Sequence, residues 1–363
     1  MEAGMHQQAI SDSCSSISTL WSPSKTPITR VRLFPDEPTF SYLTRIGLLT
    51  ATSSRSRLAG ELFGVTDFSL IDFGLHGGLG RLERLLASSD GEPIPDLAEK
   101  HTMLSFYRPF VVSSLFREAI DLANNAPGWG FLRLIGAKAR TTRQTPAACL
   151  DCIEEDIADE GIGIAYYRRV HQVIGVSVCP RHGSQLVTKC QNCGTPMDFA
   201  SLPNGHCQTC CSQLRPCESE FLSSPAAKFI TNYVEAVAAC LDGSFPVLDE
   251  ATRLAVVEAR IEALTGGARL DVRDLLLNCI SANFGRQRLA SFHLTSETWQ
   301  KSLIQGWFGN ADPISNCIVV AALFDSIDEY RQLVSAVTAE QRLHKSTGQQ
   351  LHAFQSERQL LLA

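Results

Sequence analysis

Paired cysteine and histidine residues at a two-residue spacing recur through the middle of the 363-residue sequence. In chain order, the pairs are Cys149 and Cys152, Cys179 and His182, Cys190 and Cys193, and Cys207 and Cys210. A two-residue spacer lets one tight turn present both side chains to the same ion, and zinc prefers four soft ligands of this kind in a tetrahedron. We therefore expect two zinc ions per chain.

The simplest pairing of these residues follows chain order, so that the first two pairs form one site and the last two form the other. Other pairings stay open because four further side chains lie close in the sequence: Cys211, Cys217, His171 and His206. Each expected site has all four positions filled by protein side chains. Filled sites favour a structural role for the zinc over the activation of a water molecule.

The composition favours metal binding over disulfide formation. The sequence has 13 cysteines, an odd number, and shows no charged and apolar leader of the kind that directs export. No apolar run is long enough to span a bilayer. We expect a cytoplasmic protein with reduced thiols and no membrane partner.

Motifs that would indicate catalysis are absent from the sequence. There is no phosphate-binding Gly-rich loop and no nucleophile elbow. Three adjacent acids, Glu154, Glu155 and Asp156, would point in different directions from a helix, and we interpret them as a solvated face. We expect no catalytic residues and no enzyme activity. A zinc-dependent hydrolase is the weakest alternative, because both expected sites are filled.

Charge limits any contact with nucleic acid to small patches. The formal net charge is −6, so the chain is no general binder of polyanions. Local candidates for nucleic-acid or partner binding are Arg55 and Arg57, and a second group of Arg133, Lys138, Arg140 and Arg143. The alternative is that these residues form solvated basic faces.

A further basic pair, Arg168 and Arg169, stands next to His171. Two interpretations are open for this pair. It is either a partner-binding surface or a structural element that orients the first zinc loop through hydrogen bonds around the ligands.

The elements that must position these residues are helices. Apolar residues at three- and four-residue spacing predict helices over residues 39–50 and 55–63, with the second ending at Gly64. Two short helices joined by a polar turn are typical of a helix-turn-helix, whose second helix would bring Arg55 and Arg57 toward the major groove. A plain helical hairpin is the alternative.

The same spacing predicts further helices along the chain, over residues 79–87, 113–124, 129–135, 226–241, 252–264, 272–284, 296–307 and 315–338. The expected fold class is mainly α, with four regions. These are a disordered tail over 1–28, an N-terminal helical domain with the helix-turn-helix over 29–145, a double zinc-binding region of tandem ribbons or knuckles over 146–220, and a C-terminal α-helical bundle over 221–363.

Several runs of the sequence resemble the TniQ/TnsD family of bacterial transposition proteins. The runs are CLDCIEED at 149–156, YRRVHQVIGV at 167–176, CPRHG at 179–183, SYLTRI at 41–46 and HTMLSFYRPF at 101–110. The resemblance covers about residues 33–210 and is loose beyond them. One departure is Leu150, where the family commonly has proline, and this change leaves the ligand spacing intact.

The resemblance implies a target-selection adaptor in the bacterial cytoplasm rather than a transposase. It implies the eight zinc ligands named above, and a helix-turn-helix made by the helices that hold Arg45 and Arg55. The implied partners are an AAA+ transposition ATPase, target DNA and, for some members, a CRISPR Cascade effector with its guide RNA, on which the adaptor docks as a homodimer. Two alternatives are a stand-alone protein that recognises an attachment site directly, and a zinc-containing transcriptional regulator.

Overall fold

The computed structural model describes residues 31–50, 55–64, 77–90, 96–125, 130–137, 141–199, 201–216, 225–266 and 312–360. Across these ranges the regular structure is helical, and β-pairing is limited to isolated bridges. The mainly α fold class is therefore confirmed. The expected tail over 1–28 and the expected helices over 272–284 and 296–307 lie outside the described residues.

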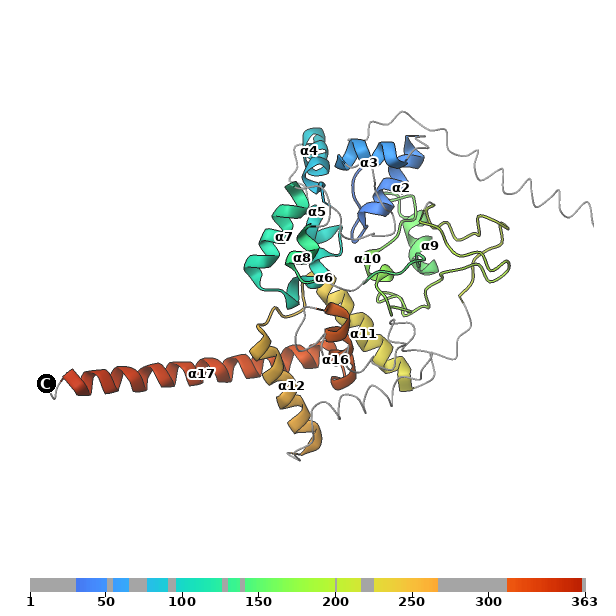
Figure 1. Cartoon of the computed structure of the whole chain (residues 1–363). Helices are drawn as coiled ribbons and strands as arrows, with labels where there is room; N and C mark the ends of the chain where they lie inside the picture. The colour runs from blue at the N-terminus through green and yellow to red at the C-terminus, as the bar shows by residue number, and fades with distance from the viewer. Residues whose placement is uncertain are drawn as a thin grey trace, which may run out of the picture.

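Three helices begin the described chain, and all three were predicted to within a few residues. They are α2 (Thr39–Leu49), α3 (Arg55–Phe63) and α4 (Leu79–Asp90) (Figure 1). Helix α2 buries nearly all of its first two turns, with Phe40, Leu43 and Ile46 at 0% exposure. Helix α3 ends at Gly64, whose φ of 73° is the left-handed conformation that glycine adopts without strain.

Helices α3 and α4 pack closely at the start of α4. A Cβ placed on Gly78 would lie 2.3 Å from the carbonyl oxygen of Phe63, so only glycine fits there. Helices α2 and α3 also pack against each other through the core that includes Leu43, Leu58 and Leu62. This pairing is compatible with a helix-turn-helix, which stays a prediction.

Short helices follow, and most of them are below the length that periodicity can predict. They are α5 (Leu97–Lys100), α6 (Leu104–Tyr107), the 3-10 helix η2 (Arg108–Phe110), α7 (Ser113–Asn125) and α8 (Gly130–Leu134). Asp96 caps α5 by accepting the backbone N–H of Glu99 at 3.3 Å. Such a cap satisfies one of the orphan donors at the helix start.

The middle of the chain has two short helices among loops. They are α9 (Leu150–Ala158) and α10 (Arg169–Gln172), which lie together on one side of the molecule (Figure 1). Outside these two helices, the described residues between 141 and 216 form turns that are held by isolated antiparallel bridges.

Four helices make up the described C-terminal part: α11 (Pro225–Asp242), α12 (Glu250–Thr265), α16 (Pro313–Leu323) and α17 (Ile327–Leu360). Helix α11 lies centrally and packs against α6, α10 and α16. Its Tyr233 is fully buried and donates a hydrogen bond to the carbonyl of Ile174 at 2.7 Å. Helix α17 extends away from the rest of the molecule (Figure 1).

The single helix expected over 315–338 is wrong, because the chain breaks between α16 and α17. Ser326 accepts the backbone N–H of Glu329 at 3.2 Å, and Glu329 accepts the backbone N–H of Asp325 at 2.7 Å. This reciprocal arrangement is close to a capping box, which starts a new helix.

One hydrophobic core runs from Val31 to Val334 and joins the N-terminal helices to α11, α12, α16 and α17. The core also contains Cys149, Cys152 and Cys179. Cys190 and Cys207 belong to a separate small cluster. None of the helices in the described ranges is both long and apolar enough to cross a membrane.

Candidate metal centres

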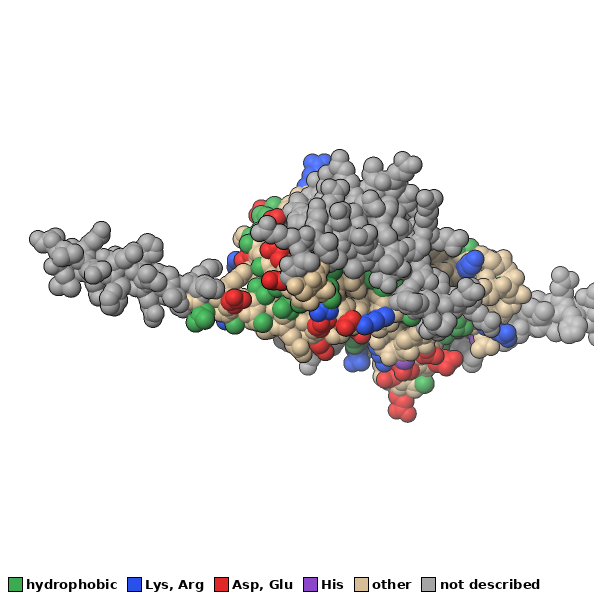
Figure 2. All heavy atoms as spheres, turned by 90° about the horizontal axis from the view of Figure 1, so that it is seen from below, with side chains coloured by type: hydrophobic (Ala, Val, Ile, Leu, Met, Phe, Trp, Pro, Cys, Tyr) green, Lys and Arg blue, Asp and Glu red, His purple; other side chains and the backbone are tan. Residues whose placement is uncertain are grey.

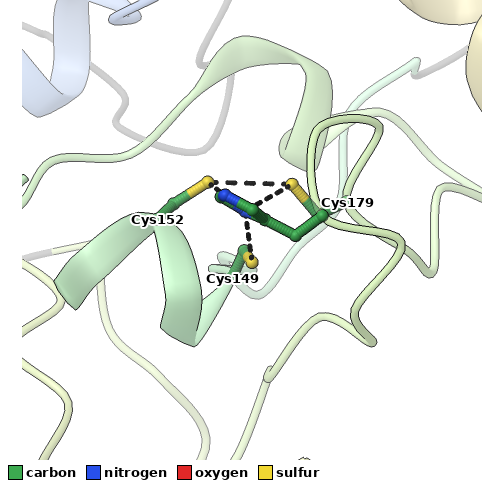
Figure 3. A group of neighbouring side chains, drawn as sticks. Cys149, Cys152 and Cys179 are labelled. Carbon is green, nitrogen blue, oxygen red and sulfur yellow. Dashed lines mark hydrogen bonds between the residues drawn. The ribbon is translucent and has the colours of Figure 1, made fainter. Parts of the chain in front are cut away.

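The first four predicted ligands converge on one point. Sγ of Cys152 lies 3.7 Å from Sγ of Cys179, and Nδ1 of His182 lies 3.5, 3.4 and 3.6 Å from the sulfurs of Cys149, Cys152 and Cys179. Figure 3 shows the imidazole nitrogen placed among the three sulfurs. The four atoms form one group able to hold a metal ion.

These distances fit a tetrahedral ion. Zinc bonds of about 2.3 Å to sulfur and about 2.0–2.1 Å to nitrogen give tetrahedral edges of about 3.8 Å between sulfurs and about 3.6 Å between sulfur and nitrogen. The measured separations are 3.7 Å between sulfurs and 3.4–3.6 Å between sulfur and nitrogen. The donor set and the space between the donors therefore suit a zinc ion.

A helix start supplies half of the first centre. Cys149 is the N-cap of α9 and Cys152 lies in its first turn, where the helix dipole favours negative thiolates. Ala148 holds this segment in place through two backbone hydrogen bonds to Val187, of 3.0 and 2.8 Å.

Three turns of the same construction supply the other ligands. In the first turn, the N–H of Cys179 donates to the carbonyl of Ser184, and the N–H of Gly183 donates to the carbonyl of Cys179, both at 2.8 Å. The turns that start at Cys190 and Cys207 repeat both bonds at 2.8–3.0 Å. A bridge flanks each turn, so each pair of ligands sits on a small, rigid loop.

The fifth residue of each turn has a left-handed backbone. Gly183 and Gly194 have φ values of 66° and 74° in the first two turns, and Cys211 has φ 58° in the third. Side chains other than glycine adopt this conformation at a cost of roughly 1–2 kcal/mol. Cys211 therefore sits where the other two turns use glycine.

The second centre forms where the last two turns face each other. Sγ of Cys190 lies 3.6 Å from that of Cys210, and Sγ of Cys193 lies 3.5 Å from that of Cys207. These four sulfurs form the second group able to hold a metal ion. Cys193 is exposed, whereas three ligands of the first centre are buried. The second centre is thus closer to solvent.

At each centre, hydrogen bonds lower the pKa of at least one cysteine ligand. Hydrogen bonds from Cys149 and Cys152, opposed by burial, hold the pKa of Cys179 well below its usual range. Hydrogen bonds from Ser212 and Asn192 lower the pKa of Cys210 to about 5. Metals bind the thiolate form, so at least one sulfur at each centre is favoured in the form that binds an ion, whereas the pKa of Cys149 and that of Cys207 are each raised to about 11.

The spare ligands that the structure describes, Cys211, His171 and His206, are not part of either group. His171 lies outside the first tetrahedron, with Nε2 3.4 Å from Sγ of Cys179, and it is buried. His206 is exposed and contacts Asn204 instead. Chain-order pairing of the eight ligands is therefore the arrangement that the geometry forms. Cys217 lies outside the described residues.

The expectation that all thiols are reduced is wrong for Cys211, which the structure describes. Cys211 is disulfide-bonded. It belongs to neither ligand group, so its sulfur is not committed to a metal. The seven cysteines of the two ligand groups, from Cys149 to Cys210, are free.

Arg168 and Arg169 do not form a surface, because both side chains are buried. Arg168 makes two hydrogen bonds to Asp156 of α9, at 3.0 and 2.7 Å, and stacks over the Tyr166 ring at 4.5 Å. Burial of both charges requires such pairing. The structural interpretation of this pair is the one that their contacts support, and the surface interpretation is corrected.

Arg169 joins three distant parts of the chain. Its guanidinium donates to Asp36 at 2.8 Å and to the carbonyls of Glu99 and Thr102 at 2.7 and 2.8 Å. It also reaches the carbonyl of Leu241, in the last turn of α11, at 3.2 Å. One side chain thereby fixes α10, which lies between the two ligand pairs of the first centre in the chain, against the N-terminal segment, α5 and α11.

Arg45 is also buried, which corrects its assignment to a nucleic-acid or partner surface. Its guanidinium bonds both oxygens of Glu37, at 3.1 and 2.6 Å, and lies 3.9 Å from the centre of the Phe34 ring. The side chains of Arg45 and Glu37 are 3% and 0% exposed. Sequence alone hides this role because the partner acid lies eight residues before the arginine and outside α2.

The other basic candidates differ in exposure. Arg57 is 74% exposed and pairs with Glu61 one turn along α3, and Arg133 is exposed on α8. Arg143 is largely enclosed, and burial lowers its pKa to about 10. Its Nε is buried with no hydrogen-bond partner among the described residues. The side chain of Arg55, and all of Lys138 and Arg140, lie outside the described residues.

Comparison with known proteins finds one family that matches part of the chain. Residues 28–186 match the model of the TniQ family, a segment that holds the N-terminal helices and the whole of the first metal centre. No curated protein matches the chain. The second metal centre and helices α11 to α17 lie beyond the matched segment. Over residues 28–186, the chain is similar to the TniQ family.

Proposed function

We propose that this chain is a target-selection adaptor for transposition. The match of residues 28–186 to the TniQ family is the observation that carries the proposal. In this role the protein does no catalysis itself. It marks an insertion site and recruits an AAA+ ATPase, which in turn brings the transposase. Target DNA, a second copy of the chain and a CRISPR effector with its guide RNA are the further partners of this proposal.

Zinc is the metal that we propose at both centres, with two ions per chain. Cys149, Cys152, Cys179 and His182 would hold the first ion, and Cys190, Cys193, Cys207 and Cys210 the second. The edge lengths and the soft donor sets support this choice. Four protein ligands at each centre support a structural role, in which the free energy of metal binding becomes free energy of folding.

The described surface supports a protein that depends on partners for tight DNA binding. Arg45 is buried, and Arg57 is neutralised by its ion pair with Glu61. On the face in Figure 2, the Lys and Arg side chains of the described residues stand in small, separate groups, and Asp and Glu are interspersed with them and also cluster at the lower edge. Release of counterions needs clustered cations, so we expect weak intrinsic affinity.

The test is fluorescence anisotropy with short DNA duplexes at physiological salt, with the full-length protein alone and with its transposition ATPase and ATP. We expect weak, sequence-independent binding by the protein alone and selective binding with partners present. Nanomolar binding of the isolated protein to one specific duplex would overturn the adaptor proposal and favour direct recognition of an attachment site.

The role of α3 can be tested separately. We expect that replacing Arg55 and Arg57 with alanine leaves DNA affinity unchanged but weakens dimerisation or co-purification with an effector complex. Arg342→Ala is a matched control, because Arg342 is exposed on α17, away from α3. Loss of DNA affinity with a flatter salt dependence would instead assign α3 to DNA as a recognition helix.

A further inference from the structure

The three adjacent acids of α9 have three different environments. Asp156 points inward to a buried ion pair, whereas Glu154 and Glu155 are exposed. Oε1 of Glu155 lies 3.0 Å from Nε2 of His182, and its Oε2 accepts from Arg181 at 2.8 Å. Among the described residues, no contact of this kind is formed by Glu154. The interpretation of all three acids as a solvated face is therefore too simple.

We propose that Glu155 is a positioning residue of the first metal centre. Nδ1 of His182 faces the three sulfurs at 3.4–3.6 Å, so the ring must carry its proton on Nε2 when Nδ1 binds a metal. Glu155 accepts that proton's hydrogen bond. The carboxylate thereby fixes the tautomer of the imidazole and the angle at which Nδ1 meets the ion.

Exposure argues for positioning over a role in fold stability. The side chain of Glu155 is 50% exposed and that of His182 is 18% exposed. Ion pairs in contact with solvent contribute little to stability, because water screens them. The hydrogen bond to a metal-bound ring acts instead on the ion, because it restrains a ring that has only one coordinating orientation.

Arg181 sets the direction of the carboxylate. It precedes His182 in the first turn, and its Nη2 holds the second oxygen of Glu155. The two oxygens are thus engaged by neighbouring residues of one rigid loop. This arrangement leaves Oε1 aimed at the imidazole.

The second centre is a control within the same molecule, because the groups that contact its ligands are of a different kind. Its sulfurs contact neutral groups: the hydroxyls of Thr195 and Ser212, at 3.2 and 3.4 Å, and the amide of Asn192, at 3.6 Å. In the described part of the chain, no carboxylate contacts a ligand of this centre. A change at Glu155 should therefore alter only the first centre.

The inference rests on the proposed zinc, but it needs neither DNA nor a transposition partner. The experiment is the release of zinc from the full-length, zinc-loaded protein to a colorimetric chelator. Glu155→Ala should accelerate one of the two release phases by about 10- to 100-fold, a typical effect of losing such a contact. Glu155→Gln keeps an acceptor oxygen and should fall between the parent and alanine variants. Glu154→Gln is the matched control and should match the parent.

A spectroscopic readout separates positioning from general loosening. In proton NMR, the Nε2–H of His182 should give a resonance protected from solvent exchange in the parent and in Glu154→Gln, and it should broaden or vanish in Glu155→Ala. Unchanged release from both Glu155 variants would overturn the proposal. Equal acceleration of both phases would also overturn it, because that result means global destabilisation. A protein that releases no zinc at all would instead contradict the proposed metal.

Discussion

Replacement of Arg169 by alanine should destabilise the protein more than replacement of any exposed arginine. The guanidinium is 5% exposed and donates to Asp36, to the carbonyls of Glu99, Thr102 and Leu241, and to the hydroxyl of Ser105. These acceptors belong to separate parts of the chain, so the variant loses hydrogen bonds that join several elements, not those of a single loop.

The magnitude follows from the groups left unpaired. Removing one partner of a buried ion pair costs about 3–5 kcal/mol. The side chain of Asp36 is 29% exposed and regains some water, which lowers this figure, while each carbonyl left without its partner adds about 1–3 kcal/mol if it stays buried. We expect a loss of at least about 3 kcal/mol, a large part of the roughly 5–15 kcal/mol that typical domains have.

The assay is urea unfolding of the zinc-loaded protein, followed by circular dichroism. Arg57→Ala is the control: Arg57 is 74% exposed and pairs with Glu61 one turn away, so its removal should cost less than about 0.5 kcal/mol. Arg169→Lys should also lose most of the stabilisation, because an ammonium cannot reach all five acceptors. A loss below about 1 kcal/mol for Arg169→Ala would refute the assignment of Arg169 as a structural hub.

Other predictions concern the metal loops and the buried core. Gly183→Ala should cost about 1–2 kcal/mol in thermal or urea unfolding, because φ is 66° and no side-chain clash is present. Gly194→Ala should behave alike, and a neutral result at both would contradict the strain argument. Burial lowers the pKa of His101 from 6.5 to about 4, so the unfolded chain binds the proton more readily. Stability should therefore fall as pH drops from about 6.5 to about 4, by on the order of 3 kcal/mol, and His101→Gln should remove this part of the pH dependence.

The ligand pairs and the longer helices could be predicted from the sequence because both depend on local spacing. Two ligands three positions apart share a turn whatever surrounds them, as Cys190 and Cys193 do. Likewise, the apolar spacing of α2 or α11 records which face is buried. The short α5, α6 and α10 show too few turns for any period to appear.

The roles of the buried arginines could not be predicted, because they depend on distant partners. Arg169 pairs with Asp36, which lies 133 residues earlier, and Arg168 pairs with Asp156, which the sequence presented as part of a solvated acidic run. The break between α16 and α17, in contrast, could have been predicted from the sequence. Ser326 and Glu329 have the three-residue spacing of a capping box, which marks the start of a new helix.

The contact between Glu155 and His182 in the first metal centre could not be predicted from the sequence either. The two residues meet only because α9 packs against the turn that starts at Cys179. The glycine at the fifth position of two turns is a local signal, however. Comparing Gly183 and Gly194 with Cys211 would have aligned the three turns from sequence alone.

The most direct test of the account is the zinc content of the intact protein by native mass spectrometry. The parent should carry two zinc ions. Cys152→Ser should keep only the ion of the second centre, and Cys193→Ser only that of the first. A parent with one ion or none after preparation with ample zinc would contradict the two-centre account, as would single variants that each lose both ions or retain both.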